Sequence, residues 1–190
     1  MSNRWETEYR AGRWAYLKGL QEAARYGVVT AWLRQVMPRG ALLDVGCGEA
    51  ILAGHLARNR VTAYVGVDIA QTALDLAKLD PTWARLVCSP LEDFAPAAGE
   101  RFAAAVFNEV LFFTDRPDAM LARYRGWLVE DGVAIVSMYQ TPRPDSGARR
   151  ATAAVWAALD GPGWRVLDEV ALTNVTKTLT WRLRLARAVP

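Results

Sequence analysis

The sequence has few of the side chains that bind transition metals or form disulfide bonds. It contains one histidine, His55, and two cysteines, Cys47 and Cys88, in 190 residues. Their positions match no zinc-site spacing, so no metal is expected. We interpret His55 as an ordinary residue of a helix.

Long hydrophobic runs are also missing. No apolar segment approaches the roughly 18 residues that a helix needs to cross a bilayer. Residues 1–10 are polar and lack the apolar core of a secretory signal. We therefore expect a cytoplasmic protein with no membrane partner. Because that compartment keeps thiols reduced, no disulfide between Cys47 and Cys88 is expected.

Basic residues are not gathered into a block. Lysine occurs only three times, and the net charge is +3. Faces that bind nucleic acid carry concentrated positive charge, so a nucleic-acid partner is not expected. Arg182 and Arg184 alternate along a late predicted strand, and we interpret them as a solvated face.

Apolar residues make up 52% of the 190 residues, enough to bury the core of one domain. We expect a helical cap over residues 1–38, with breaks near Gly12 and Gly27, and a core over residues 39–190. Alternating strands and helices predict an α/β fold in which helices cover both faces of a mostly parallel sheet. The last two of seven strands should form an antiparallel hairpin. Strands are predicted at 41–45, 63–67, 84–88, 102–108, 133–138, 164–172 and 178–186, and helices at 50–58, 70–79, 117–128 and 147–159.

The most specific motif begins where the first predicted strand ends, at Asp44-Val45-Gly46-Cys47-Gly48-Glu49-Ala50. Gly46 and Gly48 allow a sharp turn and a close approach of a ligand to the backbone. The next predicted strand ends in Asp68, whose carboxylate is placed to accept hydrogen bonds from ribose hydroxyls. The pattern predicts a nucleoside site at the carboxyl edge of the sheet.

The negative charge of this motif restricts the class of nucleoside ligand that the site can bind. A dinucleotide fingerprint would need glycine at Ile51, and Asp44 and Glu49 would repel a pyrophosphate. Asp44 is placed to accept from a cationic amine instead. The residues therefore favour a positively charged nucleoside that carries an amino-acid tail.

These segments resemble a known family. The segment from Leu43 to Ala50 resembles motif I of the class I S-adenosylmethionine-dependent methyltransferases. Val65 to Asp68 is similar to their second acidic motif, Phe102 to Phe113 to their fourth-strand segment, and Glu130 to Val133 to the turn before their fifth strand. Trp14-Ala15-Tyr16 is similar to a segment of the small NodS-like group. The resemblance implies S-adenosylmethionine as cofactor and a Rossmann-like, seven-stranded sheet with an antiparallel last strand, below an N-terminal helical lid.

The resemblance also implies roles for individual residues. Ala50 stands where the family has a third glycine, and Pro90 stands where it often has an acid for the adenine amino group. Arg25 is expected either to pair with the cofactor carboxylate or to be a solvated helix charge. The implied cofactor-binding residues are Asp44, Gly46, Cys47 and Gly48 for the methionine part, Asp68 for the ribose, Ile69, Leu91 and Glu92 for the adenine, Asn108 near the methyl group, and Trp14 and Arg25 from the cap.

Two residues are candidates for the chemistry. Glu109 is expected either to act as a general base or to belong only to the loop after the fourth strand. Tyr139, after the fifth strand, either touches the acceptor or packs under a loop. The aromatic residues before the sheet form either a lid or only the apolar face of covering helices: Trp5, Tyr9, Trp14, Tyr16 and Tyr26.

The expected activity is direct in-line methyl transfer to a small molecule, with oxygen or nitrogen as the favoured acceptor atom. The segment Asn108-Glu109-Val110-Leu111 replaces the Asp/Asn-Pro-Pro-Tyr/Phe sequence of enzymes that methylate amino groups of nucleic-acid bases. An RNA- or ribosome-associated methyltransferase and a non-catalytic cofactor-binding partner protein remain as alternatives. The protein is expected to be a monomer or a homodimer.

Overall fold

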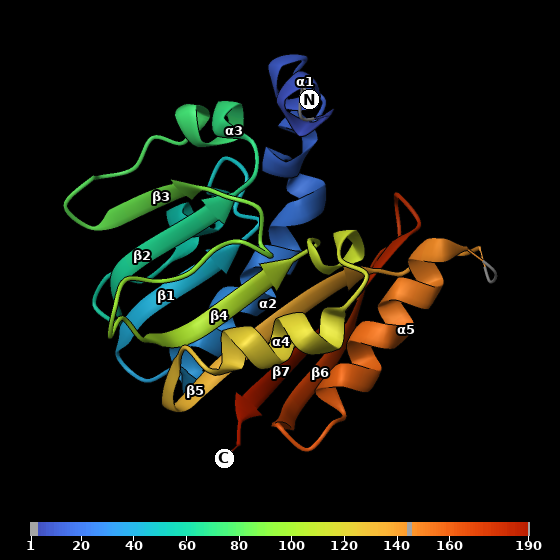
Figure 1. The fold of residues 1–190 in the computed structure, drawn as a ribbon. Coiled ribbons are helices and arrows are strands. Elements are labelled where there is room, and N and C mark those ends of the chain that lie inside the picture. The colour runs from blue at the N-terminus through green and yellow to red at the C-terminus, as the bar shows by residue number, and fades with distance from the viewer. Residues whose placement is uncertain (1–3, 144–145, 190) are drawn as a thin grey trace.

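A seven-stranded sheet forms the centre of the molecule in a computed structural model that describes residues 4–143 and 146–189 (Figure 1). The first three residues of the predicted cap lie outside the described residues. The strands are Gly40–Val45 (β1), Val61–Asp68 (β2), Ala84–Cys88 (β3), Phe102–Asn108 (β4), Leu128–Tyr139 (β5), Trp164–Asn174 (β6) and Leu179–Ala188 (β7). Their order in the sheet is β3-β2-β1-β4-β5-β7-β6. The strands β1 to β5 pair in parallel, and β7 is antiparallel to both of its neighbours, which confirms the predicted fold class.

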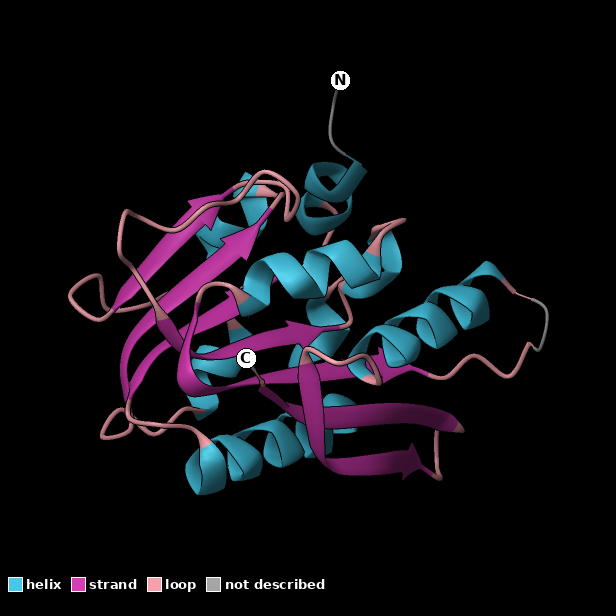
Figure 2. Cartoon of the chain, turned by 60° about the horizontal axis from the view of Figure 1, so that its bottom comes forward, coloured by secondary structure: helices cyan, strands magenta, loops and turns pink. Residues whose placement is uncertain are grey.

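Helices lie on both faces of this sheet (Figure 2). The α-helices are Arg4–Arg10 (α1), Leu20–Val36 (α2), Gln71–Leu76 (α3), Pro117–Arg125 (α4) and Gly147–Leu159 (α5). Short 3₁₀ helices span Ala15–Lys18 (η1), Ile51–His55 (η2) and Leu111–Phe113 (η3). None of the helices in the described residues is long and apolar enough to cross a membrane.

Successive side chains of each strand point to opposite faces, so the continuous apolar strands build two cores. Leu43 and Phe107 contribute to the core under α4 and α5. Leu42 and Tyr64 contribute to the core under α2. Burial of these apolar surfaces from water on both sides is the main force that holds the layers together.

The N-terminal helices differ from the prediction at one glycine. The chain leaves α1 at Arg10, and Gly12 has a φ of 68°, so the predicted break near Gly12 is confirmed. The predicted break near Gly27 is wrong, because α2 is continuous from Leu20 to Val36. A Cβ at Gly27 would contact nothing within 4 Å. The glycine costs an exposed helix about 1 kcal/mol, which the packing of the buried face offsets.

Three predicted helices are shorter in the structure, and the one expected over residues 117–128 is α4, which ends at Arg125. The helix expected over residues 50–58 is only η2, since Ala57 already accepts hydrogen bonds from the backbone N–H groups of Arg60 and Val61 and turns the chain into β2. The helix expected over residues 70–79 ends at Leu76, because Ala77 is extended. The fifth strand begins at Leu128 instead of 133, and Asp131 has a φ of 60° within it.

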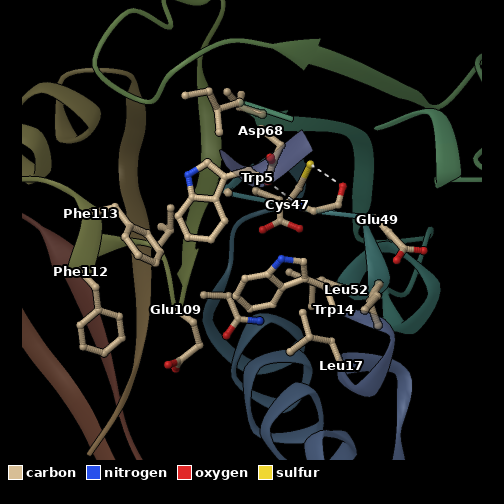
Figure 3. Close-up of a pocket in the computed structure, with 18 of the residues that line it drawn as sticks. Trp5, Trp14, Leu17, Cys47, Glu49, Leu52, Asp68, Glu109, Phe112 and Phe113 are labelled. Atoms are coloured by element: carbon tan, nitrogen blue, oxygen red, sulfur yellow. Dashed lines mark hydrogen bonds between the residues drawn. The ribbon is translucent and has the colours of Figure 1, made fainter. Parts of the chain in front are cut away.

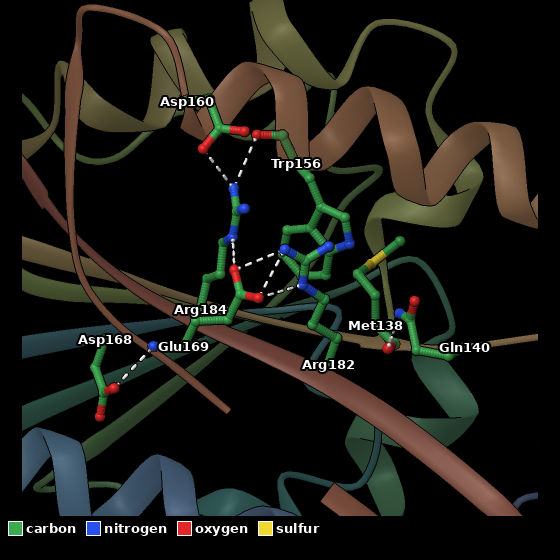
Figure 4. A network of polar contacts seen from close by, with 8 residues as sticks. All are labelled: Met138, Gln140, Trp156, Asp160, Asp168, Glu169, Arg182 and Arg184. Carbon is green, nitrogen blue, oxygen red and sulfur yellow. Dashed lines mark hydrogen bonds and ion pairs between the residues drawn. The ribbon is translucent and has the colours of Figure 1, made fainter. Parts of the chain in front are cut away.

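A polar network joins α5 to the last two strands (Figure 4). Arg184 is 7% exposed and donates to Asp160 at 2.8 Å and to Glu169. Arg182 donates to Glu169 at 2.7 Å, and both guanidinium groups lie over the ring of Trp156 at 5.1 and 5.2 Å. The interpretation of Arg184 as a solvated residue is therefore wrong. The pair of arginines fastens the helix to the antiparallel hairpin.

Candidate functional site

A cavity of about 540 Å³ opens at the carboxyl ends of the parallel strands, beneath the N-terminal segment. This volume lies within the usual range for small-molecule sites. Figure 3 views the cavity with Asp68 above and Glu109 at the lower left, and with the indole rings of Trp5 and Trp14 between them. All thirteen residues predicted for the site line it: Trp14, Arg25, Asp44, Gly46, Cys47, Gly48, Asp68, Ile69, Leu91, Glu92, Asn108, Glu109 and Tyr139.

The glycine turn brings the backbone of β1 to the cavity wall. Gly46 and Gly48 have φ angles of 70° and 55°, in the left-handed region that favours glycine. A Cβ at Gly48 would lie 2.5 Å from the hydroxyl oxygen of Tyr9 in α1. Ala50 also has a φ of 55°. Ala50 therefore has the left-handed backbone conformation expected of a third glycine at this position, although it carries a methyl group.

The two acids flank that turn. The carboxylate of Asp44 is 2% exposed and accepts a hydrogen bond from the hydroxyl of Tyr64 at 2.6 Å. Burial raises the pKa of Asp44 to about 7. Asp68 accepts from the backbone N–H groups of Gly48 at 2.8 Å and Ala70 at 2.9 Å, and burial also raises its pKa. The carboxylate of Asp68 thus joins the loops after β1 and β2 and lines the cavity between them.

Arg25 reaches the site from the middle of α2. Its side chain is 1% exposed, so the alternative of a solvated helix charge is wrong. The guanidinium donates to Glu22 at 2.7 Å and to the side-chain oxygen of Asn108 at the end of β4. Burial is the largest single effect and lowers the pKa of Arg25, but Glu109, Tyr26 and Glu22 together outweigh it, so the pKa is raised. Arg25 therefore places a positive charge in the cavity wall, and the carboxylate of Glu22 pairs with it.

Glu109 lies in the loop after β4 with a φ of 62°, which is uncommon for a residue with a side chain. Its carboxylate accepts from the Ser137 hydroxyl at 2.8 Å and from the backbone N–H of Tyr139 at 2.7 Å. Burial raises the pKa of Glu109 to about 7. A carboxylate with this pKa exchanges protons near neutral pH, as a general base requires.

The other end of the cavity is lined by the loops after β2 and β3. Ile69, the first residue after β2, lines this end of the cavity and is 40% exposed. Leu91 and Glu92 line the same end, and the carbonyl of Leu91 accepts a hydrogen bond from the hydroxyl of Tyr124 at 2.9 Å. The loop that contains Pro90 is thereby fixed to α4.

The N-terminal segment forms the roof, as the lid hypothesis expects. Trp5 packs edge-on against Phe113 with ring centroids 4.7 Å apart, and Trp14 lies 5.6 Å from Trp5 and 6.0 Å from Tyr9. The indole N–H of Trp14 is buried and donates to no acceptor in the described part of the chain. An unpaired buried donor is costly, so this N–H indicates a hydrogen-bond partner that a ligand supplies.

Two polar contacts fasten the roof to the sheet side. Lys18 of η1 forms an ion pair with Glu49 of the glycine turn. The carboxylate of Glu6 in α1 accepts from the backbone N–H of Gln71 at 2.6 Å and of Thr72 at 3.1 Å, and from the hydroxyl of Thr72. Glu6 therefore provides hydrogen-bond acceptors for the first turn of α3, which otherwise lacks them.

Several lining residues were not predicted from the sequence. The lining residues without a predicted role in the site are Leu17, Glu22, Ile51, Leu52, Val67, Ser89, Val110, Phe112, Phe113, Leu179 and Trp181. Two residues outside the lining were also missed because their partners are distant in the chain: Tyr64, which hydrogen-bonds Asp44, and Glu6, which holds the roof. For Trp181, the only sequence feature that could have indicated a place in the cavity lining is that it is an aromatic residue near the start of the last strand.

The lining is strongly acidic. Six carboxyl groups face one guanidinium group, that of Arg25: Glu22, Asp44, Glu49, Asp68, Glu92 and Glu109. Walls of one sign favour ligands of the opposite charge and repel those of the same sign. In residues 4–143 and 146–189 no group of three potential metal ligands comes together.

Comparison with known proteins agrees with this geometry. Residues 43–136 match the family described as "Methyltransferase domain". The chain is 29% identical over 101 residues to the ubiquinone biosynthesis O-methyltransferase of Neisseria meningitidis serogroup C (strain 053442), a match that covers 50% of this chain and 42% of the relative. The chain thus spans less than half the length of the curated relative that it matches.

Solved structures share the fold. The N-methyltransferase NodS from Bradyrhizobium japonicum WM9, with S-adenosyl-L-homocysteine, superposes with a TM-score of 0.75 at 16% identity, over 93% of this chain and 92% of that one. The 1,6-didemethyltoxoflavin-N1-methyltransferase of Burkholderia thailandensis gives a TM-score of 0.71 at 20% identity, over 97% and 85% of the two chains. With the matching family and the acids that flank the glycine turn, the chain belongs to the class I S-adenosylmethionine-dependent methyltransferases.

Proposed function

We propose that this protein transfers a methyl group from S-adenosylmethionine to an oxygen or nitrogen atom of a small molecule. The observation that carries the proposal is the cavity of about 540 Å³ that Asp44, the glycine turn, Asp68 and Glu109 line together. Residues 1–38 serve as the cap of this site and residues 39–190 as its core.

The residues of the cavity fit the cofactor. Asp44 accepts from its ammonium group, and Asp68 accepts from the ribose hydroxyls with the lone pairs that Gly48 and Ala70 leave free. A side chain at Gly48 would clash with the hydroxyl of Tyr9, so only glycine allows α1 of the roof to close against the turn. Ile69, Leu91 and Glu92 contact the adenine.

The cofactor carboxylate needs donors, and two residues provide them. The unpaired indole N–H of Trp14 donates to it, and Arg25 offers the donor positions that Glu22 and Asn108 do not use. Hydrogen bonds to charged groups are the strong ones, which suits a carboxylate held in a buried site. Asn108, fixed by Arg25, borders the position of the transferred methyl group.

The cofactor supplies an activated methyl group, so the protein has to orient the acceptor and remove its proton. Orientation of two reactants supplies about 7–11 kcal/mol of a barrier. Glu109 accepts the proton, and Tyr139, whose backbone N–H holds the Glu109 carboxylate, borders the acceptor. The aromatic roof excludes water from the reaction.

The acidic lining supports a small molecule rather than RNA. A polyanionic acceptor would meet five more carboxyl groups than cations on the cavity wall. The relatives are named as an O-methyltransferase of ubiquinone biosynthesis and as N-methyltransferases, activities that also concern small molecules. These names are compatible with either oxygen or nitrogen as the acceptor atom. A non-catalytic role is disfavoured because Ala50 retains the backbone turn.

Calorimetric titration with S-adenosylhomocysteine tests the first half of the proposal. We expect binding to the wild-type protein and a loss of about 100-fold in Asp68→Ala, from two hydrogen bonds to a charged group. Asp118→Ala removes an exposed carboxylate from α4 and should change nothing. Absence of binding by the wild-type protein at millimolar ligand would overturn the proposal.

Consumption of S-adenosylmethionine with a panel of phenols, amines and heteroaromatic compounds tests the second half. One methylated product identified by mass spectrometry supports catalysis. Cofactor binding without turnover on any member of the panel would instead favour the non-catalytic alternative.

A further inference from the structure

The end of the cavity away from Asp68 is built from different elements and forms what we call the acceptor chamber. Its walls are Tyr16 of η1, Tyr26 of α2, Tyr139 of β5 and Trp181 of β7, with Glu109 among them. Tyr139 and Trp181 are direct partners in the antiparallel ladder. The backbone N–H of Tyr139 also donates to Glu109, and the guanidinium of Arg25 lies over the rings of both Tyr26 and Trp181, so side chains from separate elements meet here.

The chamber has flat and firmly supported walls. The ring of Tyr26 stacks on His55 with centroids 5.4 Å apart and planes at 7°. The guanidinium of Arg25 lies 4.9 Å from the ring of Tyr26 and 5.8 Å from that of Trp181. Trp181 is itself 4% exposed. Because His55 and Arg25 already cover the ring of Tyr26, the faces offered to a ligand are those of Tyr16, which is 47% exposed, and of Tyr139. Such faces favour stacking with another planar ring over contact with a puckered or flexible chain.

The charges of the chamber do not cancel. Glu22 and Arg25 pair with each other, so the chamber has a net negative charge wherever Glu109 is ionised, which is above its raised pKa of about 7. Each oxygen of Glu109 accepts one hydrogen bond in the structure, from Ser137 and from Tyr139, and keeps a lone pair for a ligand donor. In this buried setting an anionic ligand group beside Glu109 would be strongly repelled.

We propose that the acceptor is a planar aromatic or heteroaromatic molecule with no anionic group, which presents an N–H or O–H to the carboxylate of Glu109. The inference rests on the proposed function. When the acceptor nitrogen or oxygen forms its bond to the methyl carbon, the carbon–sulfur bond breaks and its electron pair stays on sulfur. The acceptor proton moves to Glu109, so the positive charge on sulfur and the negative charge on the carboxylate disappear together.

Three probes of one skeleton separate charge from planarity: 2-naphthol, 2-naphthoate and decahydro-2-naphthol. Their binding to the full chain saturated with S-adenosylhomocysteine is measured by calorimetry at pH 8, above the pKa of about 7 of Glu109. We expect 2-naphthol to bind at least tenfold more tightly than either of the others. Tighter or equal binding of 2-naphthoate, equal binding of decahydro-2-naphthol, or no binding of any probe to the saturated protein would overturn the inference.

The variant Glu109→Gln tests the role of the charge itself. We expect 2-naphthoate to gain about tenfold in affinity and 2-naphthol to lose severalfold, while the affinity for S-adenosylhomocysteine and the melting temperature show that the variant is folded. The control Glu130→Gln makes the same change on an exposed residue of β5 outside the cavity lining and should alter neither probe. Unchanged discrimination in Glu109→Gln would refute the inference.

Failure of the inference is distinguishable from failure of the proposed function. Rejection of all three probes by a protein that binds S-adenosylhomocysteine removes only the acceptor class. A wild-type protein that does not bind S-adenosylhomocysteine removes the proposed function, and the inference with it.

Discussion

The buried carboxyl group of Asp44 should make the affinity for the cofactor depend on pH. Burial raises its pKa from 3.8 to about 7, a shift that corresponds to about 4 kcal/mol. Because the raised pKa favours the protonated form, this group stabilises the ligand-free fold at low pH. That contribution is lost as the pH rises from about 4 to about 7. A bound ammonium group reverses the effect, since it favours the ionised carboxylate.

Affinity for S-adenosylhomocysteine should therefore increase with pH. Below pH 7 the carboxyl group is neutral, and each binding event must release its proton. The association constant should rise up to about tenfold per pH unit from pH 5.5 and level off above about 7. Asp44→Asn should give weak binding with no such rise, and Asp118→Asn should keep the wild-type profile. Isothermal titration in buffers from pH 5.5 to 9.5 measures these profiles.

Tyr64 provides a second test of the same reasoning. Its hydroxyl donates to Asp44 at 2.6 Å and lowers the pKa of that carboxyl group. Loss of a hydrogen bond to a charged group is worth about 1.5–3 kcal/mol, so Tyr64→Phe should move the inflection upward by about one to two pH units. Because Glu109 also has a pKa of about 7, the titrations are repeated in Glu109→Gln. A flat profile for the wild-type protein, or an unchanged inflection in Tyr64→Phe, would refute the reasoning.

Three further changes probe the glycine turn and the roof. Gly46→Ala would place a Cβ 2.5 Å from a methyl carbon of Val110, at a φ of 70° that strains a residue with a side chain. We expect the free energy of unfolding in urea to fall by about 2–4 kcal/mol and Val110→Ala to restore part of it. An unchanged unfolding midpoint would contradict this expectation. Trp14→Phe should weaken S-adenosylhomocysteine about tenfold and leave 5′-methylthioadenosine, which lacks the carboxylate, unaffected; equal losses for both ligands would argue against this contact. Glu6→Gln should speed the dissociation of S-adenosylhomocysteine severalfold in stopped-flow measurements, whereas Glu8→Gln should not, and identical rates would show that Glu6 does not hold the roof.

The parts of the fold and site that depend on local signals could be predicted from the sequence. Asp44, Gly46, Gly48 and Asp68 all follow directly after apolar strands, and parallel strands carry their carboxyl ends to one edge. Strand positions were close for the same reason, since buried parallel strands are continuous apolar runs. The order of these signals along the chain was therefore sufficient to place the cavity.

The contacts that complete the site could not be predicted because they depend on register and packing. Tyr64 reaches Asp44 only because β1 and β2 pair with Asp44 opposite Gly66. Glu6 meets its partner Gln71 across 65 positions of sequence. Arg25 was expected to be either solvated or paired with the ligand. The structure instead buries it beside Glu22, an i,i+3 neighbour that the sequence does reveal, and beside Asn108, which no local pattern reveals.

The attachment of α1 to α3 has a consequence for turnover. One carboxylate, that of Glu6, both closes the roof and completes the hydrogen bonding at the start of the helix that follows Asp68 and Ile69. The exit for spent nucleoside therefore cannot widen while this first turn stays fully bonded. On the proposed function we therefore expect product release to require that the N–H groups of Gln71 and Thr72 exchange Glu6 for water, at the start of the six-residue helix that follows Asp68 and Ile69.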